Sequence, residues 1–381
     1  MPSPPEIPFN KPFFAGKELD YIAEAVAQGQ LSGDGPFTRR CHAWLESHLG
    51  CRRAFLTPSC TAALEMTAIL CDLKPGDEVI LPSFTFASTA NAFVLRGAVP
   101  VFVDIHADVP NIDAALVEAA VTPRTRAIVP VHYAGQACDM DALMSIAAAR
   151  NLYVVEDAAQ SLLSTYKGKQ LGSIGHFGCL SFHETKNVIS GEGGALLVND
   201  ARFIERAEII REKGTNRSRF FRGEVDKYTW MDIGSSYLPS ELVGAFLFAQ
   251  LERAAEIVAE RRRLCAHYTA CLRDLAARGT ITLPGAPDAS DSNGHLFYLL
   301  APSPAQRDAL LKHLRARGIW AIFHFIPLHD SPAGRTYGRV GSVMTNTVAT
   351  SNRLIRLPLY FGMQQFDVER VAEEIHAFFT T

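Results

Sequence analysis

Short apolar runs and amphipathic stretches alternate along the first part of this chain, with polar connections between them. The apolar runs have the length of buried strands, and the amphipathic stretches have the spacing of helices. The predicted strands are residues 53–57, 78–81, 99–103, 127–131, 152–157, 177–182 and 194–198. The predicted helices are residues 62–71, 112–121, 140–149 and 201–213. Strands that alternate with helices predict an α/β fold, with a mostly parallel central sheet flanked by helices.

The last third of the chain has a different pattern. Residues 239–263 predict one long helix that ends in basic residues, which suits a link between domains. Beyond it, the pattern predicts a strand over 295–300 and helices over 304–317 and 368–379. We therefore expect a large α/β domain over residues 1–250 and a smaller C-terminal α+β domain over residues 251–381.

Composition narrows the class of protein. Hydrophobic residues make up 48% and charged residues 20%, and no apolar run approaches the roughly 20 residues of a membrane span. The net charge of -3 gives no general attraction to nucleic acid or to a membrane, so we expect neither as a partner. The first residues lack the pattern of a signal peptide, so we expect a cytoplasmic location. The eight cysteines contain no C-x-x-C pair, which favours reduced thiols over disulfides or a metal cluster.

A polar segment with one lysine separates two of the predicted strands. After Phe182 the chain reads His183-Glu-Thr-Lys186-Asn and returns through Gly191-Glu-Gly-Gly194. This order places Lys186 at the edge of the sheet, where its long side chain can reach a ligand. Burial lowers the pKa of an amine towards the neutral form that a Schiff base requires. Taken alone, the pattern more often belongs to a solvated loop lysine, so its interpretation depends on the rest of the chain.

Other predicted strand ends also carry groups suited to a ligand. Pro58-Ser-Cys-Thr61 opens a helix whose first amides can bind an anion such as phosphate, although an ordinary helix cap is the alternative. The strand ending at Glu156 and Asp157 needs a cation or a donor for its buried acid, and a protonated pyridine nitrogen would serve. Metal binding is the alternative there, but no second carboxylate or histidine occurs nearby at the spacing of metal ligands. Phe86 either fills the core or stacks on a planar ring.

Two predicted loops are further candidates for ligand contact. Residues 31–36 contain Gly33 and Gly35, which allow the backbone to approach a ligand closely, although an ordinary surface turn fits equally well. Residues 214–223 are basic and aromatic. They form either a solvated face or a site for a pyrophosphate and a base.

Four motifs occur together in the order and spacing of one known family. They are Thr57-Pro-Ser-Cys-Thr-Ala-Ala-Leu64, Pro82-Ser-Phe-Thr-Phe-Ala-Ser-Thr89, Val155-Glu-Asp-Ala-Ala-Gln160, and Ser181-Phe-His-x-x-Lys-Asn187 with Gly191-Glu-Gly-Gly194. From about Pro8 to the C-terminus, the chain resembles the DegT/DnrJ/StrS sugar aminotransferases. The resemblance implies a fold-type-I transferase that depends on pyridoxal 5'-phosphate (PLP) and acts on nucleotide-linked keto sugars.

The resemblance also implies roles for cofactor-binding residues. Lys186 matches the Schiff-base lysine that also moves protons, and Asp157 matches the carboxylate that keeps the pyridine nitrogen protonated. Gln160 matches the residue at the phenolic oxygen of the ring, and Phe86 matches the aromatic residue stacked on it. The implied phosphate contacts are Cys60, Thr61, Ser181 and, from a neighbouring subunit, Ser236.

Two of these positions depart from the family pattern. Ser236 stands where asparagine is common, and its shorter side chain needs a water to reach the phosphate. Cys60 replaces the commoner glycine or alanine; only its backbone amide is required, but a thiol near an aldehyde cofactor is an oxidation liability.

The resemblance further implies a homodimer with shared active sites. The basic stretch over 217–227 has no obvious partner in its own domain, which also favours a second subunit. The implied substrate contacts are Ser32 and Gly33 near the sugar, Arg217, Arg219, Arg222 and Lys227 on the diphosphate, and His329 beside the sugar.

The implied reaction moves an amino group from glutamate, through the pyridoxamine phosphate (PMP) form of the cofactor, to a keto sugar. Three segments most resemble the enzymes that convert dTDP-4-keto-6-deoxyglucose to dTDP-4-amino-4,6-dideoxygalactose for surface glycans: Pro58-Ser-Cys-Thr61, His183-Glu-Thr-Lys186-Asn and Gly234-Ser-Ser-Tyr-Leu-Pro-Ser-Glu241. The alternatives are the equatorial 4-amino epimer and a 3-amino sugar. Related dehydratases carry histidine at the lysine position, so Lys186 argues against that activity. A PLP-binding regulator without turnover would have little use for a proton-shuttling lysine.

Overall fold

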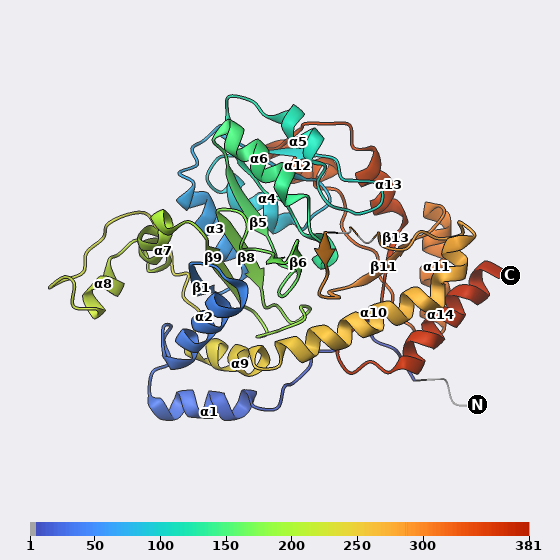
Figure 1. The fold of residues 1–381 in the computed structure, drawn as a ribbon, viewed down its shortest axis with the longest axis horizontal. Helices are drawn as coiled ribbons and strands as arrows, with labels where there is room; N and C mark the ends of the chain where they lie inside the picture. The colour runs from blue at the N-terminus through green and yellow to red at the C-terminus, as the bar shows by residue number, and fades with distance from the viewer. Residues whose placement is uncertain (1–4, 286, 288, 381) are drawn as a thin grey trace.

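The structure is a computed structural model that describes residues 5–285, 287 and 289–380. Within these residues, the largest sheet has eight strands in the order β1-β9-β8-β5-β4-β2-β3-β12 (Figure 1). Strand β9 runs antiparallel to both of its neighbours, and the other neighbouring pairs are parallel. The predicted α/β class with a mostly parallel central sheet is therefore confirmed. The strands are β1 (Arg53–Thr57), β2 (Glu78–Pro82), β3 (Val99–Val103), β4 (Thr125–Ile128), β5 (Tyr153–Asp157), β8 (Phe177–Ser181), β9 (Gly194–Val198) and β12 (Arg339–Val340).

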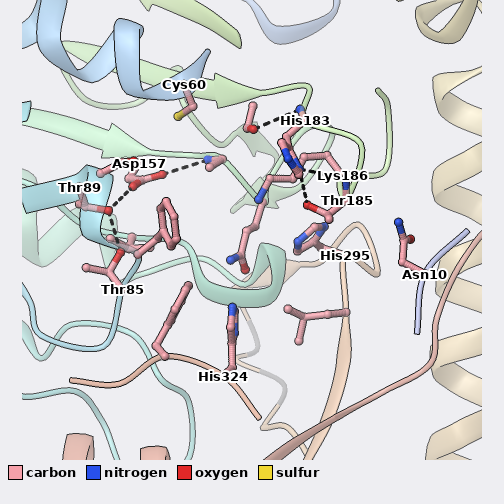
Figure 2. Close-up of a pocket in the computed structure, with 18 of the residues that line it drawn as sticks. Asn10, Cys60, Thr85, Thr89, Asp157, His183, Thr185, Lys186, His295 and His324 are labelled. Atoms are coloured by element: carbon pink, nitrogen blue, oxygen red, sulfur yellow. Dashed lines mark hydrogen bonds between the residues drawn. The ribbon is translucent and has the colours of Figure 1, made fainter. Parts of the chain in front are cut away.

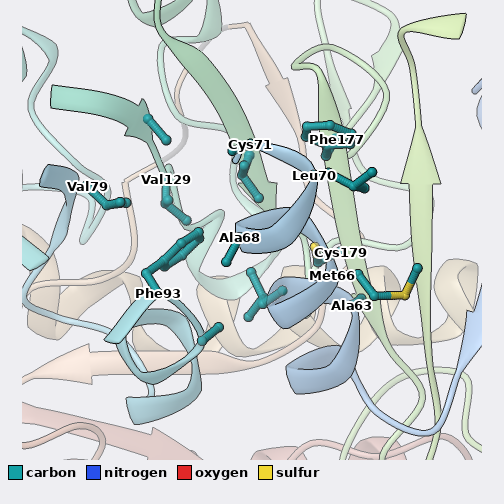
Figure 3. Packing of buried hydrophobic residues seen from close by; sticks show 14 of the residues in the cluster. Ala63, Met66, Ala68, Leu70, Cys71, Val79, Phe93, Val129, Phe177 and Cys179 are labelled. Carbon is teal, nitrogen blue, oxygen red and sulfur yellow. The ribbon is translucent and has the colours of Figure 1, made fainter. Parts of the chain in front are cut away.

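Both faces of this sheet are buried, because alternate side chains of each strand point to opposite faces. In β2, Val79 and Leu81 join one hydrophobic cluster, whereas Ile80 joins another on the opposite face. The first cluster is covered by α3 (Cys60–Leu70), α4 (Ala87–Val94) and α7 (Ile204–Arg211), and Figure 3 shows its packing. The opposite face is covered by α2 (Pro36–Leu49), α5 (Ala114–Ala120), α6 (Met140–Arg150) and α9 (Glu241–Leu251).

The C-terminal part of the chain has its own hydrophobic core. Strand β11 (Phe297–Leu300) pairs antiparallel with β13 (Leu354–Leu357), and α10 (Ala254–Ala277), α11 (Pro304–Ala316) and α14 (Gln365–Thr380) pack on this pair. Strand β12 also comes from this part of the chain, yet it pairs with β3 of the main sheet. The first turns of α10 pack into the core of the main sheet as well. A division into domains 1–250 and 251–381 stays a prediction.

The remaining elements are short or lie at the surface. The helices are α1 (Glu18–Gln28), α8 (Arg217–Phe221), α12 (Pro332–Tyr337), α13 (Thr345–Arg353) and the 3-10 turns η1 (Tyr133–Gly135), η2 (Ala201–Phe203) and η3 (Leu328–Asp330). The strands β6 (Thr165–Tyr166), β7 (Lys169–Gln170) and β10 (Ser290–Asp291) form a small sheet. In the part of the chain that the structure describes, no helix has both the length and the apolar character needed to cross a membrane.

Three predicted elements differ from the structure. The single helix expected over 239–263 is two helices, α9 and α10, because the chain turns at Arg253, which has φ -111° and ψ 10°. The guanidinium of Arg253 donates to the carbonyl oxygen of Ala15, so contact with the N-terminal segment holds this break. The strand expected over 127–131 ends earlier, ahead of Pro130, which has no N–H to donate to a sheet. Part of the expected loop over 214–223 forms the helix α8.

Candidate active site

A cavity of about 570 Å³ opens at the carboxyl ends of the central strands. Its walls come from distant parts of the chain: the ends of β5 and β8, the first turns of α3 and α4, the segment at Phe9, and the C-terminal core. Figure 2 shows Asp157, Lys186, His295 and His324 around this space. Open parallel sheets bind their ligands at this edge, so the cavity is the candidate active site.

Lys186 lies in the return between β8 and β9. The backbone closes this return, because the amide of Phe182 donates to the Gly193 carbonyl at 2.8 Å and the amide of Glu184 donates to the Gly191 carbonyl at 2.9 Å. Gly191 has φ 78°, in the left-handed region that favours glycine. Burial lowers the pKa of the Lys186 amine, the positive charge of Arg356 lowers it further, and the negative charge of Asp157 opposes both. The net shift favours the neutral, nucleophilic amine.

Asp157 is the last residue of β5, and its side chain faces the cavity. The hydroxyl of Thr89 donates to its carboxylate at 2.7 Å, and the amide of Ala159 donates at 3.2 Å. The hydroxyl of Thr85 lies 2.7 Å from that of Thr89 and extends this chain of hydrogen bonds (Figure 2). Burial raises the pKa of Asp157 in spite of these donors. A cation placed beside the carboxylate would favour its ionised form.

The neighbouring carboxylate, Glu156, points to the opposite face of the sheet. It accepts hydrogen bonds from the backbone amides of Gly172 and Ile174 and from Nε2 of His132. Glu156 is fully buried and already holds the turn before β8 in place. The two acids at the end of this strand therefore differ, because only Asp157 is directed into the cavity.

The N-terminal turn of α3 forms a cradle for an anion. The hydroxyl of Ser59 accepts from the amide of Ala62 at 3.1 Å, which leaves the earlier amides of Cys60 and Thr61 without an intrahelical acceptor. Gly194 lies so close that an added Cβ would stand 2.4 Å from the Cys60 nitrogen. Thr61 and Ser181 also line the cavity at this end. Free amides and the helix dipole together favour a phosphate here.

The thiol of Cys60 is buried within this region. Burial raises the pKa of Cys60 well above its usual value. The thiol therefore stays protonated, and a protonated thiol is a weak nucleophile.

Two more of the predicted cofactor contacts line the same cavity. Phe86 is 64% exposed at the start of α4, so its ring offers an open face to a planar ligand. Gln160 is buried, and its side-chain oxygen accepts from the amide of Ala134 at 2.7 Å. This bond orients the Gln160 side chain towards the cavity with its amide nitrogen still available as a donor.

The structure does not bring the remaining predicted residues into this cavity. Ser32 and Gly33 lie in a turn against residues 238–239, and Ser236 lies in an outer segment beside Glu212. His329 forms a hydrogen bond with Ser83, with 2.6 Å between its Nδ1 and the hydroxyl oxygen. The basic residues Arg217, Arg219, Arg222 and Lys227 lie on and after α8, which projects from the body of the fold (Figure 1).

One expectation about this basic stretch is wrong. Arg219 forms ion pairs with Glu205 and Glu224, and Arg222 forms ion pairs with Glu208 and Glu224. Both arginines therefore have partners within their own domain. Glu224 follows these arginines directly in the chain, whereas Glu205 and Glu208 lie on α7, which only the folded chain brings beside α8.

The cavity also contains residues that the sequence analysis missed. His295, His324, Phe325 and Arg356 line it from the C-terminal part, and Phe9 and Asn10 line it from the N-terminal segment. His324 is the histidine of the segment before α12 that faces the cavity, with Nδ1 2.7 Å from the hydroxyl of Tyr133. No local pattern distinguishes His324 from His329, because packing against Tyr133 decides which of them points inward.

The residues present fit PLP in four separate places. A lysine amine biased to the neutral form suits the aldehyde, a buried carboxylate suits a protonated pyridine nitrogen, and the amide-lined cradle suits the phosphate. The exposed ring of Phe86 suits the planar ring of the cofactor.

Comparison with known proteins gives the same assignment. The model of the DegT/DnrJ/EryC1/StrS aminotransferase family matches residues 14–376. The spore coat polysaccharide biosynthesis protein SpsC of Bacillus subtilis is 33% identical over 377 residues, which covers 97% of this chain and 96% of that protein. The GDP-perosamine synthase of Caulobacter vibrioides is 32% identical over 372 residues, which covers 96% of both.

Solved structures show the same fold. The aminotransferase TlmJ of Streptoalloteichus hindustanus superimposes with a TM-score of 0.90 at 28% identity and covers 99% of both chains. Spr1654 of Streptococcus pneumoniae in its PLP form superimposes with a TM-score of 0.89 at 26% identity and covers 98% of both chains. The chain therefore belongs to the DegT/DnrJ/EryC1/StrS aminotransferase family, and it is a PLP-dependent sugar aminotransferase.

Proposed function

We propose that this enzyme transfers an amino group from glutamate to C4 of dTDP-4-keto-6-deoxyglucose. The products are dTDP-4-amino-4,6-dideoxygalactose, for surface-glycan synthesis, and 2-oxoglutarate. The observation that carries the transfer chemistry is the pairing of Lys186, whose amine is biased to the neutral form, with the buried carboxylate of Asp157 in one cavity. A cytoplasmic location and the site roles given below belong to the same proposal.

The proposed mechanism assigns a task to each residue of the cavity. When bound, PLP supplies an electron sink and carries the amino group between the two substrates. Lys186 holds and moves a proton at Nζ, because burial lowers the pKa of its amine and its side chain lines the cavity. Asp157 would hold the cofactor's ring nitrogen in its protonated form, while the hydroxyl of Thr89 donates to the carboxylate and fixes it.

The remaining contacts hold and orient the cofactor. The amides of Cys60 and Thr61 and the hydroxyl of Ser181 would bind the phosphate, as the cradle at α3 supports. The ring of Phe86 would cover the planar ring of the cofactor, and the amide nitrogen of Gln160 would donate to its ring oxygen.

The choice of sugar rests on the amino-acid sequence of two motifs and on the names of the relatives. The segments Pro58-Ser-Cys-Thr61 and Gly234-Ser-Ser-Tyr-Leu-Pro-Ser-Glu241 favour the dTDP-linked 4-amino sugar with an axial amine. One relative at 33% identity acts in polysaccharide biosynthesis, which agrees with a glycan product. The other, at 32% identity, makes a GDP-linked sugar, so GDP is the competing nucleotide.

The product of a defined reaction tests this choice. The holoenzyme is incubated with L-glutamate and either dTDP-4-keto-6-deoxyglucose, the GDP-linked 4-keto-6-deoxy sugar, or a dTDP-linked 3-keto sugar. We expect 2-oxoglutarate and an amino sugar with the dTDP 4-keto substrate, and a small proton coupling between H3 and H4, since the amine is axial. A large coupling, an amine at C3, or a preference for the GDP sugar would contradict the proposed product and leave the transaminase assignment intact.

We further propose a homodimer in which each subunit completes the other's active site. The segment from α8 onwards supports this, because its large apolar side chains are exposed: Phe220, Phe221, Tyr228, Trp230, Met231 and Ile233. An apolar surface of this kind on a projecting segment is typical of an interface. In that dimer, Ser236 would reach the neighbouring phosphate through a water. Arg217 and Lys227 are the strongest candidates for the diphosphate, because within the described residues neither forms an ion pair with a carboxylate, whereas Arg219 and Arg222 do.

Sedimentation velocity tests the dimer. We expect the wild-type enzyme to sediment as a dimer at assay concentration, and Trp230→Glu to shift it towards monomer with a parallel loss of activity, since a charge would enter an apolar interface. Trp320→Glu is the matched control, because Trp320 packs under Arg315 away from this segment. A wild-type monomer with full activity would rule out shared active sites.

A further inference from the structure

Arg356 is a charged residue of the cavity that the proposed mechanism leaves without a task. It lies in β13 between Ile355 and Leu357, which are both buried in the C-terminal core. Because side chains alternate along a strand, Arg356 points the other way and lines the cavity. Its backbone is fixed, since the amide of Arg356 donates to Ile322 O at 2.7 Å and the amide of Ile322 donates back at 3.1 Å.

The guanidinium of Arg356 lacks an anionic partner. Among the described residues, no carboxylate lies within ion-pair distance of it, and its Nε is shielded from solvent without an acceptor. Nη2 donates only to the carbonyl oxygen of Phe323 at 3.2 Å, and the group lies over the ring of Phe9 at 4.9 Å. A half-buried charge without a counterion is costly, so an anion that enters the cavity would relieve that cost.

The other basic groups of the cavity are less suited to bind an anion. Arg261 already donates to the carbonyl oxygens of Gly294 and His295. Nε2 of His183, which also lines the cavity, lies 3.7 Å from the carboxylate of Glu192. Burial lowers the pKa of His295 and of His324 well below the usual value, so both are uncharged at neutral pH. Lys186 is biased to the neutral form as well. Within the described residues, the cavity therefore offers Arg356 as its free positive charge.

We propose that Arg356 binds the α-carboxylate of the amino-acid donor. This inference rests on the proposed reaction only in requiring an amino acid as the donor. The carbon that gives up the amine is bonded directly to that carboxylate, so the anion must lie close to the group that takes the proton. Arg356 and Lys186 line the same cavity, so a carboxylate bound by Arg356 would share that space with the amine that takes the proton.

A carboxylate fits this position better than a diphosphate does. The diphosphate of a nucleotide-linked sugar is several bonds from C4, so its anchor lies farther from the reacting atoms. The planar guanidinium presents parallel N–H donors that match the two oxygens of a carboxylate. Arg356 thus serves the first half-reaction, and the diphosphate is bound elsewhere.

Equilibrium binding to the holoenzyme tests this assignment. 2-Oxoglutarate and pyruvate, which share the α-carboxylate, and dTDP are each titrated by calorimetry into wild type, Arg356→Met and Arg356→Lys. We expect Arg356→Met to weaken the binding of both keto acids about 10- to 100-fold, because a charge-assisted hydrogen-bonded pair is lost. Arg356→Lys should weaken the binding of the keto acids less, since lysine keeps the positive charge but lacks the planar guanidinium. The affinity for dTDP should stay within about twofold of wild type, since dTDP has no carboxylate.

Controls separate this inference from other causes. Arg263→Met removes an arginine whose ion-pair partner among the described residues is Glu260 on α10, and it should leave the binding of all three probes unchanged. Circular dichroism identifies a variant that fails to fold, in which case Arg356→Lys carries the test. The inference is overturned if keto-acid affinity is unchanged in Arg356→Met, if only 2-oxoglutarate is affected, or if dTDP affinity falls instead. Failure of wild type to bind dTDP would count against the proposed nucleotide alone.

Discussion

Lys186→Ala is expected to lower turnover by about 10⁴-fold, since general acid-base catalysis by a positioned group contributes up to that factor. The variant lacks the amine that lies in the cavity with a lowered pKa, and the cavity has no second lysine among the described residues. We also expect the visible absorption of the lysine-bound cofactor to change to that of free PLP. Single-turnover measurements with glutamate and absorption spectra check both results.

Two controls make this prediction specific. Lys167→Ala removes a surface lysine that pairs with Asp141, and it should leave turnover and the spectrum unchanged. A small amine such as ethylamine, added to Lys186→Ala, should restore part of the activity, because it can move the proton in place of the side chain. A Lys186→Ala enzyme that aminates its substrate at the wild-type rate would exclude the assigned role.

Asp157→Asn is the second change with a large expected effect. Of the two acids that line the cavity within the described residues, Asp157 is buried and Glu192 is exposed, so loss of the Asp157 charge leaves the cofactor's ring nitrogen without a buried counterion. Loss of one partner of a buried charge pair costs about 3–5 kcal/mol, which corresponds to about 10²- to 10⁴-fold in rate. Turnover should fall by that factor, whereas PLP affinity should change less, because the phosphate cradle at α3 is intact.

The matched controls for Asp157→Asn come from its neighbours. Thr89→Val removes one hydrogen bond to the carboxylate and keeps the charge, so it should lower turnover by much less. Glu156→Gln changes the adjacent carboxylate, which holds a turn on the other face of the sheet, so it should lower thermal stability more than turnover. Near-normal turnover of Asp157→Asn would show that another group protonates the ring nitrogen.

Much of the fold could be predicted from the sequence because its strands are nearly all apolar. Strand β2, for example, is buried on both faces. A continuous run of apolar residues of this kind is typical of a parallel sheet that is covered by helices. Helix ends were harder to predict. Helix α2 begins after a glycine-rich turn that looks like a loop, and the break at Arg253 depends on the N-terminal segment that packs beside it.

The sequence by itself determined the class of fold and the two groups at the centre of the candidate site. Lys186 and Asp157 stand where apolar strands end, and in a parallel sheet those ends meet at one edge, so local pattern is enough to bring them together. Only the tertiary structure decided that Asp157 rather than Glu156 faces the cavity, that His324 rather than His329 lines it, and that Arg356 is left unpaired there. Each of these outcomes depends on packing between segments far apart in the chain, and the pattern of neighbouring residues carries no information about such contacts.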